Sequence, residues 1–358
     1  MNNYEDGLEV DPEEDQDDQM FVNYDITTYP SDFTLNVLYG MWKNESIIIP
    51  DFQRDYVWSI NQASLLIDSF LIGLPVPQVF FYIDNDYKNL VIDGQQRLLS
   101  IFYYFEGFFG KENERGKRQV FHLSGLNKKH PLYNKAFKEL DDKTKRKLEN
   151  AVLRAINVRQ VNPKDGRSSI YYIFERLNTG GTPLKSQEIR NCVYRGDFLN
   201  SLRKLNENAD WRKILGKSIP DKHQNDVELI LRAFGLCNNI DMYEKPMKRF
   251  LNIIAEKYQK DNDKKIKDFE QRFQRAAHLV ATNFRDKPFS ARGPLNTSLF
   301  DSIFCTIINN IDKIPDNISS KYETLLEDKV FIDYTTMATS DEKILKKRFE
   351  YVQKNLTG

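Results

Sequence analysis

The stretch from Val91 to Ser100 has the residue types of a small anion-binding site. Its first residues close an apolar run that predicts a buried strand, and the apolar residues from Leu98 onward predict a helix over 95–106. Between them lie a carboxylate, a glycine, two amides and a guanidinium: Asp93, Gly94, Gln95, Gln96 and Arg97. A strand that turns through glycine into a helix directs backbone N–H groups and the positive end of the helix dipole at one point. That point favours phosphate, and a guanidinium in the first turn adds donors to it.

The same residues also have a purely structural interpretation. Asp93 would cap the helix, and Arg97, four residues later, would pair with Asp93 at the surface. These ten residues leave the two interpretations open, so the decision depends on the rest of the chain.

A second polar turn, Gln53-Arg54, is flanked by Tyr56 and Trp58 and follows a predicted strand over 46–49. An amide and a guanidinium beside aromatic rings suit a phosphate that carries a stacking ring. An aromatic lid over the core, with Arg54 at the surface, explains the same residues equally well.

A third turn, Asn178-Thr179-Gly180-Gly181, separates two predicted helices, and the second helix contains Glu188 and Arg190. Adjacent glycines let the backbone approach a ligand closely, and the following helix again offers its N-terminus to an anion. A helix C-cap is the structural alternative for the glycines. Three such turns beside well-packed elements are harder to explain structurally than one, and together they favour a ligand pocket.

Several other chemistries are excluded by the sequence. The four histidines include no pair at metal-ligand spacing, no P-loop pattern occurs, and no local motif supports Ser-His-Asp catalysis. The three cysteines are far apart among apolar neighbours, which predicts reduced packing residues. We therefore expect no metal site built from protein side chains alone.

The net charge is zero but unevenly distributed. The first twenty residues contain nine acids and no bases, so the remaining chain carries about +9. This composition predicts an acidic disordered tail over residues 1–21, either solubilising or shielding a basic surface from nucleic acid or polyphosphate. No apolar stretch approaches the roughly 18 residues that span a bilayer. With no secretory signal visible either, we expect a cytoplasmic protein without a membrane partner.

Hydrophobic periodicity predicts an α+β fold in two domains. Residues 22–184 mix strands and helices, and residues 185–358 show apolar residues at helical spacing throughout. In the first domain we expect strands over 46–49, 79–83, 90–92, 120–123 and 151–161, and helices after a Ser31 or Asp32 cap, from Ser59 or Asn61 to Gly73, and over 95–106, 136–149 and 168–178.

Four motifs occur in a fixed order: Ile49-Pro50-Asp51-Phe52-Gln53-Arg54 with Tyr56 and Trp58, then Gly73-Leu74-Pro75-Val76-Pro77, then Asp93-Gly94-Gln95-Gln96-Arg97, then Asn178-Thr179-Gly180-Gly181-Thr182-Pro183-Leu184 with Glu188 and Arg190. With these motifs, residues 30–240 resemble the GmrS-like family of GmrSD-type, modification-dependent restriction systems. Glu228 and Arg232 fit a late position of that family.

The resemblance implies a ParB- and sulfiredoxin-like mixed α/β core that binds and hydrolyses a nucleoside triphosphate with Mg²⁺. In that family the Asp-Gly-Gln-Gln-Arg turn belongs to the nucleotide site. By this resemblance, Asp93 and Gln96 orient metal or water and Arg97 holds phosphate, as the candidate catalytic residues. The candidate nucleotide-binding residues are Gln53, Arg54, Gly94, Gln95, Asn178, Gly180, Gly181, Glu188 and Arg190.

Longer relatives carry a histidine-containing nuclease domain, whose motif this sequence lacks and for which it has no room. The resemblance therefore predicts a nucleotide-hydrolysing sensor or regulator of restriction or anti-phage defence. Its expected partners are DNA, including modified foreign DNA, and a separate nuclease subunit. The alternative is a non-catalytic DNA-binding module that uses nucleotide only as a switch. Direct cleavage by the α/β core ranks lowest, because no carboxylate cluster has two-metal spacing.

Overall fold

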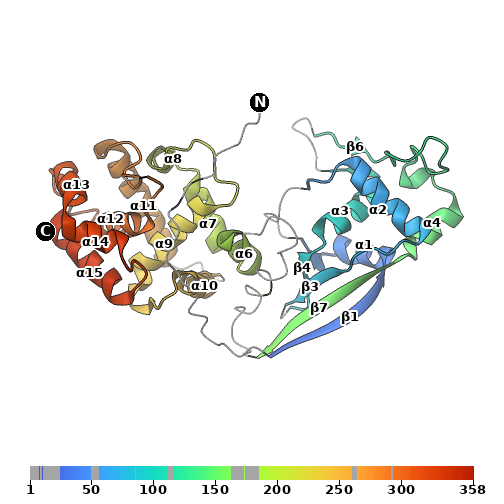
Figure 1. Cartoon of the computed structure of the whole chain (residues 1–358), viewed down its shortest axis with the longest axis horizontal. Helices are drawn as coiled ribbons and strands as arrows, with labels where there is room; N and C mark the ends of the chain where they lie inside the picture. The colour runs from blue at the N-terminus through green and yellow to red at the C-terminus, as the bar shows by residue number, and fades with distance from the viewer. Residues whose placement is uncertain are drawn as a thin grey trace. The chain divides into compact units, whose positions relative to one another are not determined.

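The computed structural model describes residues 8, 10, 25–49, 56–84, 86–110, 116–162, 173, 185–259, 264–291 and 293–358. The chain divides into two units: an α/β unit over Asn23–Pro183, and a helical unit that combines Met1–Val22 with Leu184–Gly358. The order of elements confirms the expected fold class, a mixed α/β region followed by an all-helical one (Figure 1).

The α/β unit contains seven strands and four α-helices among its described residues. In chain order these are β1 (Asp25–Thr34), α1 (Leu35–Lys43), β2 (Ile47–Ile48), α2 (Ile60–Ile72), β3 (Val79–Ile83), β4 (Asn89–Asp93), α3 (Gln95–Glu106), β5 (Phe108–Phe109), β6 (Gln119–Val120), the 3-10 helix η1 (Phe137–Glu139), α4 (Asp142–Glu149) and β7 (Val152–Asn162).

Five of these strands form one mixed sheet in the order β1-β7-β3-β4-β2. β1 is antiparallel to β7, β7 parallel to β3, β3 antiparallel to β4, and β4 parallel to β2. These directions bring the ends of β1, β4 and β2 and the starts of β7 and β3 to the same end of the sheet. We call this end the site end, because the predicted Asp93 turn lies there.

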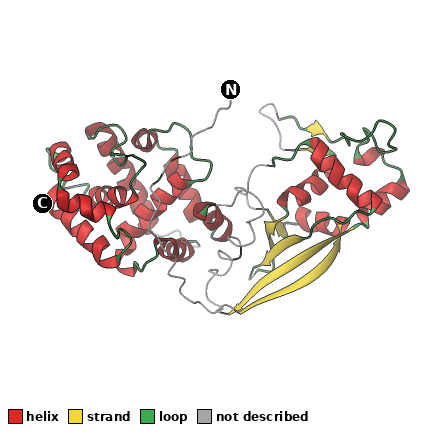
Figure 2. Cartoon of the chain, in the orientation of Figure 1, coloured by secondary structure: helices red, strands yellow, loops and turns green. Residues whose placement is uncertain are grey.

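One face of the sheet is covered by helices, as Figure 2 shows. Alternate residues of β3, namely Val79, Phe81 and Ile83, face the helices and are buried among apolar side chains of α1, α2 and α3. Successive side chains of a strand point to opposite faces, so the same helices contact every second residue of β3. The core thus fixes β3 and β4, and with them the turn that leads into α3.

Several predicted elements are confirmed. α3 spans Gln95–Glu106 as expected, and the strands around residues 79–83 and 90–92 are present. α2 begins with a capping box between Ser59 and Gln62 and ends at Gly73 in the left-handed conformation.

The prediction that Ser31 or Asp32 caps the first helix is wrong. Both residues lie in β1, which pairs with β7 along its whole length, and the helix begins only at Leu35 after a Thr34 cap. The sequence of β1 gives little strand signal, whereas its partner strand supplies the ladder hydrogen bonds that hold it extended.

Two further boundaries differ from the expected ones. The helix predicted over 136–149 is split, because Leu140 is extended and Asp141 then caps a separate α4. The strand predicted over 120–123 is shorter and ends at Val120. The helix predicted over 168–178 lies outside the described residues, apart from residue 173.

The helical unit is built from α6 (Ser186–Val193), α7 (Asp197–Asn206), α8 (Ala209–Leu215), α9 (Asn225–Asn239), η3 (Ile240–Met242), α10 (Met247–Tyr258), α11 (Lys264–Asn283), α12 (Thr297–Asn309), α13 (Ile318–Glu327), α14 (Lys329–Thr336), α15 (Glu342–Val352) and the terminal π-helical turn η4 (Gln353–Thr357). Its core is strongly aromatic: Trp211 of α8 packs against Phe273, Phe300 and Phe304. Two residues of the N-terminal segment belong to this unit, since Leu8 is buried and Val10 forms a parallel bridge with Leu295.

Candidate functional site at the β4–α3 turn

The turn between β4 and α3 requires glycine at position 94. Gly94 has a φ of 97°, in the left-handed region, and an added Cβ would lie 2.3 Å from Cγ1 of Val79. A side chain here would therefore strain the backbone and collide with β3. Because Gly94 is also the N-cap residue, no side chain caps the start of α3. The positive end of this twelve-residue helix thus lies at the site end of the sheet.

Asp93 and Arg97 form an ion pair across this turn. The Nη2 atom of Arg97 lies 2.8 Å from Oδ2 of Asp93 and donates a second hydrogen bond, of 3.0 Å, to the carbonyl oxygen of Gln78. The Asp93 side chain is 45% exposed and that of Arg97 18%. The structural interpretation is therefore right about the pair and wrong about the cap.

The guanidinium of Arg97 is not fully satisfied by the described residues. Its Nε atom is buried and has no hydrogen-bond partner among them. Buried side-chain donors normally have a partner, and a donor beside a helix N-terminus favours an anion. Arg97 thus has one hydrogen-bond donor without a partner among the described residues, at the point where the sequence predicts phosphate.

Gln96 holds the chain segment that enters α2. Its Oε1 atom accepts the backbone N–H groups of Val57 and Trp58, at 3.0 and 3.2 Å. Tyr56 reinforces this attachment through a 2.8 Å hydrogen bond to Ser100, and burial raises the pKa of Tyr56 to about 12. The Gln96 carbonyl is thus engaged by backbone, which favours a positioning role over direct orientation of water.

The second predicted turn, Gln53-Arg54, lies outside the described residues. The structure does describe what precedes and follows it. β2 ends at Ile48 at the site end, parallel to β4, and the chain from Tyr56 is attached to the first two turns of α3. That Gln53 and Arg54 face Asp93 and Arg97 stays a prediction.

A second ion pair at the site end was not predicted from the sequence. Arg154 of β7 donates two hydrogen bonds to Asp32 of β1, at 2.8 and 2.9 Å, and these bonds lower the pKa of the Asp32 carboxyl. The pair borders a groove of about 600 Å³, which Gln78 and apolar side chains from Phe70 to Pro77 also line. Gln78 therefore connects the groove with Arg97. The pair joins residues 122 positions apart, so no local pattern could reveal it.

The third predicted turn is described only in part. Asn178, Gly180 and Gly181 lie outside the described residues, whereas Glu188 and Arg190 lie on α6 of the helical unit. The Glu188 carboxylate accepts the backbone N–H of Lys185 at 2.6 Å and thereby caps α6. The structure thus places these two side chains within the helical unit.

Arg190 is fully buried and its donors are used within that unit. It donates to Asn252 on α10 at 2.8 Å, to Glu228 on α9 at 2.5 Å and to Gln187 at 3.1 Å. Glu228 and Arg232, which fit a late position of the family, therefore have different ion-pair partners. Arg232 instead forms a buried pair with Asp301 of α12.

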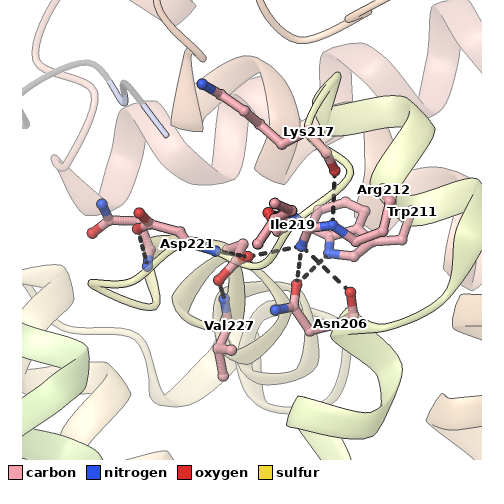
Figure 3. Close-up of polar contacts among 9 residues, drawn as sticks. Asn206, Trp211, Arg212, Lys217, Ile219, Asp221 and Val227 are labelled. Atoms are coloured by element: carbon pink, nitrogen blue, oxygen red, sulfur yellow. Dashed lines mark hydrogen bonds and ion pairs between the residues drawn. The ribbon is translucent and has the colours of Figure 1, made fainter. Parts of the chain in front are cut away.

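Another buried network surrounds Asp226 at the start of α9 (Figure 3). Asp226 accepts hydrogen bonds from Arg212 at 2.7 Å and from the backbone N–H groups of Asp221 and Val227. Arg212 also donates to Asn206 and to the carbonyl oxygens of Lys217 and Ile219. Because the partners in this network are parts of the fold itself, we interpret it as structural.

Two searches of the described residues gave no candidates. No group of three or more His, Cys, Asp or Glu side chains is arranged there to hold a metal ion. Within the same residues, no helix has both the length and the apolar character needed to cross a membrane.

Comparison with protein families finds one match. Residues 35–195 match the family described as the GmrSD restriction endonuclease N-terminal domain. This match covers the α/β unit from α1 onward and extends through α6, and it confirms the family inferred from the four motifs. No curated protein matches the chain.

Proposed function

From the premise that residues 35–195 form a GmrSD restriction endonuclease N-terminal domain, we propose that the β4–α3 turn binds and hydrolyses a nucleoside triphosphate. The observation that carries the proposal is the Asp93–Arg97 pair at the start of α3. There a required glycine, a helix N-terminus and an unsatisfied guanidinium donor come together. Each of these features favours a phosphate group.

In this proposal Arg97 would bind the phosphates and Asp93 would supply a carboxylate ligand to Mg²⁺. A single carboxylate fits that role, because Mg²⁺ in nucleotide sites commonly takes one or two carboxylates together with phosphate oxygens and water. The metal and the guanidinium would stabilise the charge that develops during phosphoryl transfer. Gln96 acts as a positioning residue through Val57 and Trp58.

The remaining contacts are assigned to the two turns that the sequence singled out. Gln53-Arg54 and the segment Asn178–Gly181 would complete the pocket, together with backbone of Gly94 and Gln95. Glu188 and Arg190 would contribute indirectly, by fixing α6, the helix that follows this segment in the chain. Nucleotide hydrolysis would serve the restriction of modified foreign DNA, with cleavage by a separate nuclease subunit.

The test is phosphate release by the full chain with ATP, GTP, CTP or UTP and Mg²⁺. We expect Arg97→Ala and Asp93→Asn each to lower turnover at least about 100-fold, the effect of removing one group that stabilises transition-state charge. A matched control is available in α11, where Arg272 and Asp268 form an ion pair of the same spacing and similar exposure. Arg272→Ala and Asp268→Asn should leave turnover within about twofold of the wild-type value.

Turnover that survives in both Arg97→Ala and Asp93→Asn would overturn the proposal. A thermal-shift series separates hydrolysis from binding alone. If one triphosphate raises the melting temperature of the wild-type chain and no phosphate is released, the nucleotide is a switch and the chain is a binding module.

A further inference from the structure

Charge is strongly segregated within the α/β unit. Residues 23–110 contain ten acids and four bases, whereas residues 116–150 contain ten bases and four acids. The second stretch contains β6, nearly all of the connection from β6 to β7, and α4. A short segment with a net charge of +6 beside one with −6 produces a positive field that is local to one surface.

Most of these positive side chains reach solvent. Lys143, Arg146 and Lys147 have the i, i+3, i+4 spacing of one face of α4, and that face is exposed, while Leu148 on the opposite side is buried in the core. Three more exposed lysines lie between β6 and the helix. We call the six side chains the α4 surface: Lys128, Lys129, Lys138, Lys143, Arg146 and Lys147.

The six residues belong to one connected part of the fold. The Nζ atom of Lys145 in α4 donates to the carbonyl oxygen of Lys138 at 3.0 Å. His130, next to Lys129, lies 3.5 Å from Asp68 of α2, and α4 packs on the same helix. Figure 1 shows α4 and the preceding loops at one end of the unit.

The six bases of the α4 surface outnumber the exposed carboxylates Glu139, Asp141 and Asp142 that lie among them in the chain. None of its six side chains forms an ion pair with a described carboxylate, whereas Arg118 of the same stretch is paired with Glu106. Unpaired exposed cations of this density need an anionic partner or remain solvated by counterions.

We propose that the α4 surface binds the phosphate backbone of DNA. This inference rests on the proposed function, because a restriction-system domain acts on DNA. Lysine is depleted in protein–protein interfaces, so a lysine-rich surface favours nucleic acid over an acidic protein. Membrane insertion needs an apolar helix face, and α4 has one apolar side chain, Leu148, which is buried.

The test is a titration of a fluorescent DNA duplex with the full chain at several salt concentrations. The variant Lys143→Gln, Arg146→Gln, Lys147→Gln removes three phosphate contacts. It should weaken binding at least about tenfold at low salt and reduce the slope of log K against log salt by nearly 3, since each contact contributes about 0.9. The loss should be the same on modified and unmodified DNA, because phosphates carry no base information.

The control is a second lysine triad with the same spacing on α15. Lys343, Lys346 and Lys347 are likewise exposed, and their replacement by Gln should change DNA affinity less than twofold. A second variant, Lys128→Gln with Lys129→Gln, probes the loop without touching α4, so that a folding defect in α4 does not obscure the result. It should reduce the slope by up to about 1.8.

Phosphate release in the absence of DNA separates this proposal from the previous one, because the triple α4 variant should keep the wild-type rate. An unchanged salt slope in both surface variants, or an equal loss in the α15 control, would overturn the assignment. So would binding of the wild-type chain to anionic phospholipid vesicles but not to DNA.

Discussion

Two sets of arginine–carboxylate pairs, one from each unit, lie in opposite environments. At the site end of the α/β unit, the pairs Asp93–Arg97 and Asp32–Arg154 have carboxylates that are about half exposed. In the helical unit, the carboxylates of Asp226 and Asp301 are fully buried beside their arginines. The same chemical pair is therefore accessible to a ligand in the first set and enclosed by the fold in the second.

This contrast distinguishes ion pairs that stabilise the fold from ion pairs that a ligand can reach. The buried carboxylates receive hydrogen bonds from backbone or neighbouring helices, so their partners are fixed by the fold. Exposure alone does not make a binding site, however. Asp268–Arg272 is as exposed as Asp93–Arg97 but lies within α11, where the helix uses its own backbone groups. The Asp93 pair, in contrast, combines exposure with the start of a helix.

The largest loss of stability is expected when a buried ion pair of the helical unit is broken. Asp226→Asn removes the counter-charge of Arg212 and should lower the free energy of unfolding of the helical unit by about 3–5 kcal/mol. Hydrogen exchange of α9 amides as a function of urea measures this loss. As a control, Asp312→Asn breaks an exposed pair with Arg275 and should cost less than about 1 kcal/mol. Equal losses in the two variants would remove the distinction between the environments.

A smaller loss is expected when the backbone of the site end is altered. Gly94→Ala should lower the free energy of unfolding of the α/β unit by about 2–3 kcal/mol, because strain at positive φ adds to the collision with Val79. Gly107, at the other end of α3, has a φ of 85° and open space around it. Gly107→Ala should therefore cost only about 1 kcal/mol, as measured by exchange of α3 amides. If Gly94→Ala lowers the free energy of unfolding no more than Gly107→Ala does, Val79 of β3 moves aside at little cost.

Breaking the exposed pairs Asp93–Arg97 and Asp268–Arg272 should have nearly equal effects on the free energy of unfolding. The two variants should differ in how much nucleotide stabilises them. Asp93→Asn and Asp268→Asn should each lower the free energy of unfolding by less than about 1 kcal/mol. Saturating Mg²⁺ and triphosphate at about 100 Kd should stabilise the wild-type chain by about 2.7 kcal/mol. Thermal unfolding with nucleotide should show this gain in Asp268→Asn and not in Asp93→Asn. The same gain in both variants would contradict the comparison.

The smallest effect is expected for Asp32, and it depends on pH. The hydrogen bonds from Arg154 lower the pKa of Asp32 below its ordinary value of 3.8. The stabilisation from this pair is therefore present at neutral pH and is lost as the pH falls through the lowered pKa. Melting temperatures of the wild type and Asp32→Asn should differ slightly at pH 7 and converge in acid. A difference that grows in acid would mean that Arg154 does not hold the carboxylate.

The parts of the fold that depend on local chemistry were predictable from the sequence. The bounds of α3 and the end of α2 follow from periodicity and from glycine, which the backbone needs at Gly73 and Gly94. β1 could not be predicted in this way, because its extended conformation depends on β7, far along the chain. Long-range pairing overrides weak local preference there.

The candidate site likewise has contacts that the sequence predicted and contacts that it could not show. The sequence predicted the contact of Asp93 with Arg97, because the two opposite charges lie four residues apart across the turn into α3. The sequence could not show that the carbonyl of Gln78 holds Arg97, or that Gln96 binds the backbone of Val57. The burial of Arg190 was equally inaccessible, because its partners come from two other helices.

The pairing of β1 with β7 has a consequence for where the chain enters and leaves the sheet of the α/β unit. These are the first and last described strands of the α/β unit, and they are antiparallel, so Asp25 lies opposite Asn162. A segment whose two ends are neighbours can be inserted into a surface loop of another protein without stretching its host. Its ends can likewise be joined and the chain reopened elsewhere. The sheet topology thus makes residues 25–162 a segment whose two ends a host loop or a circular permutation could join.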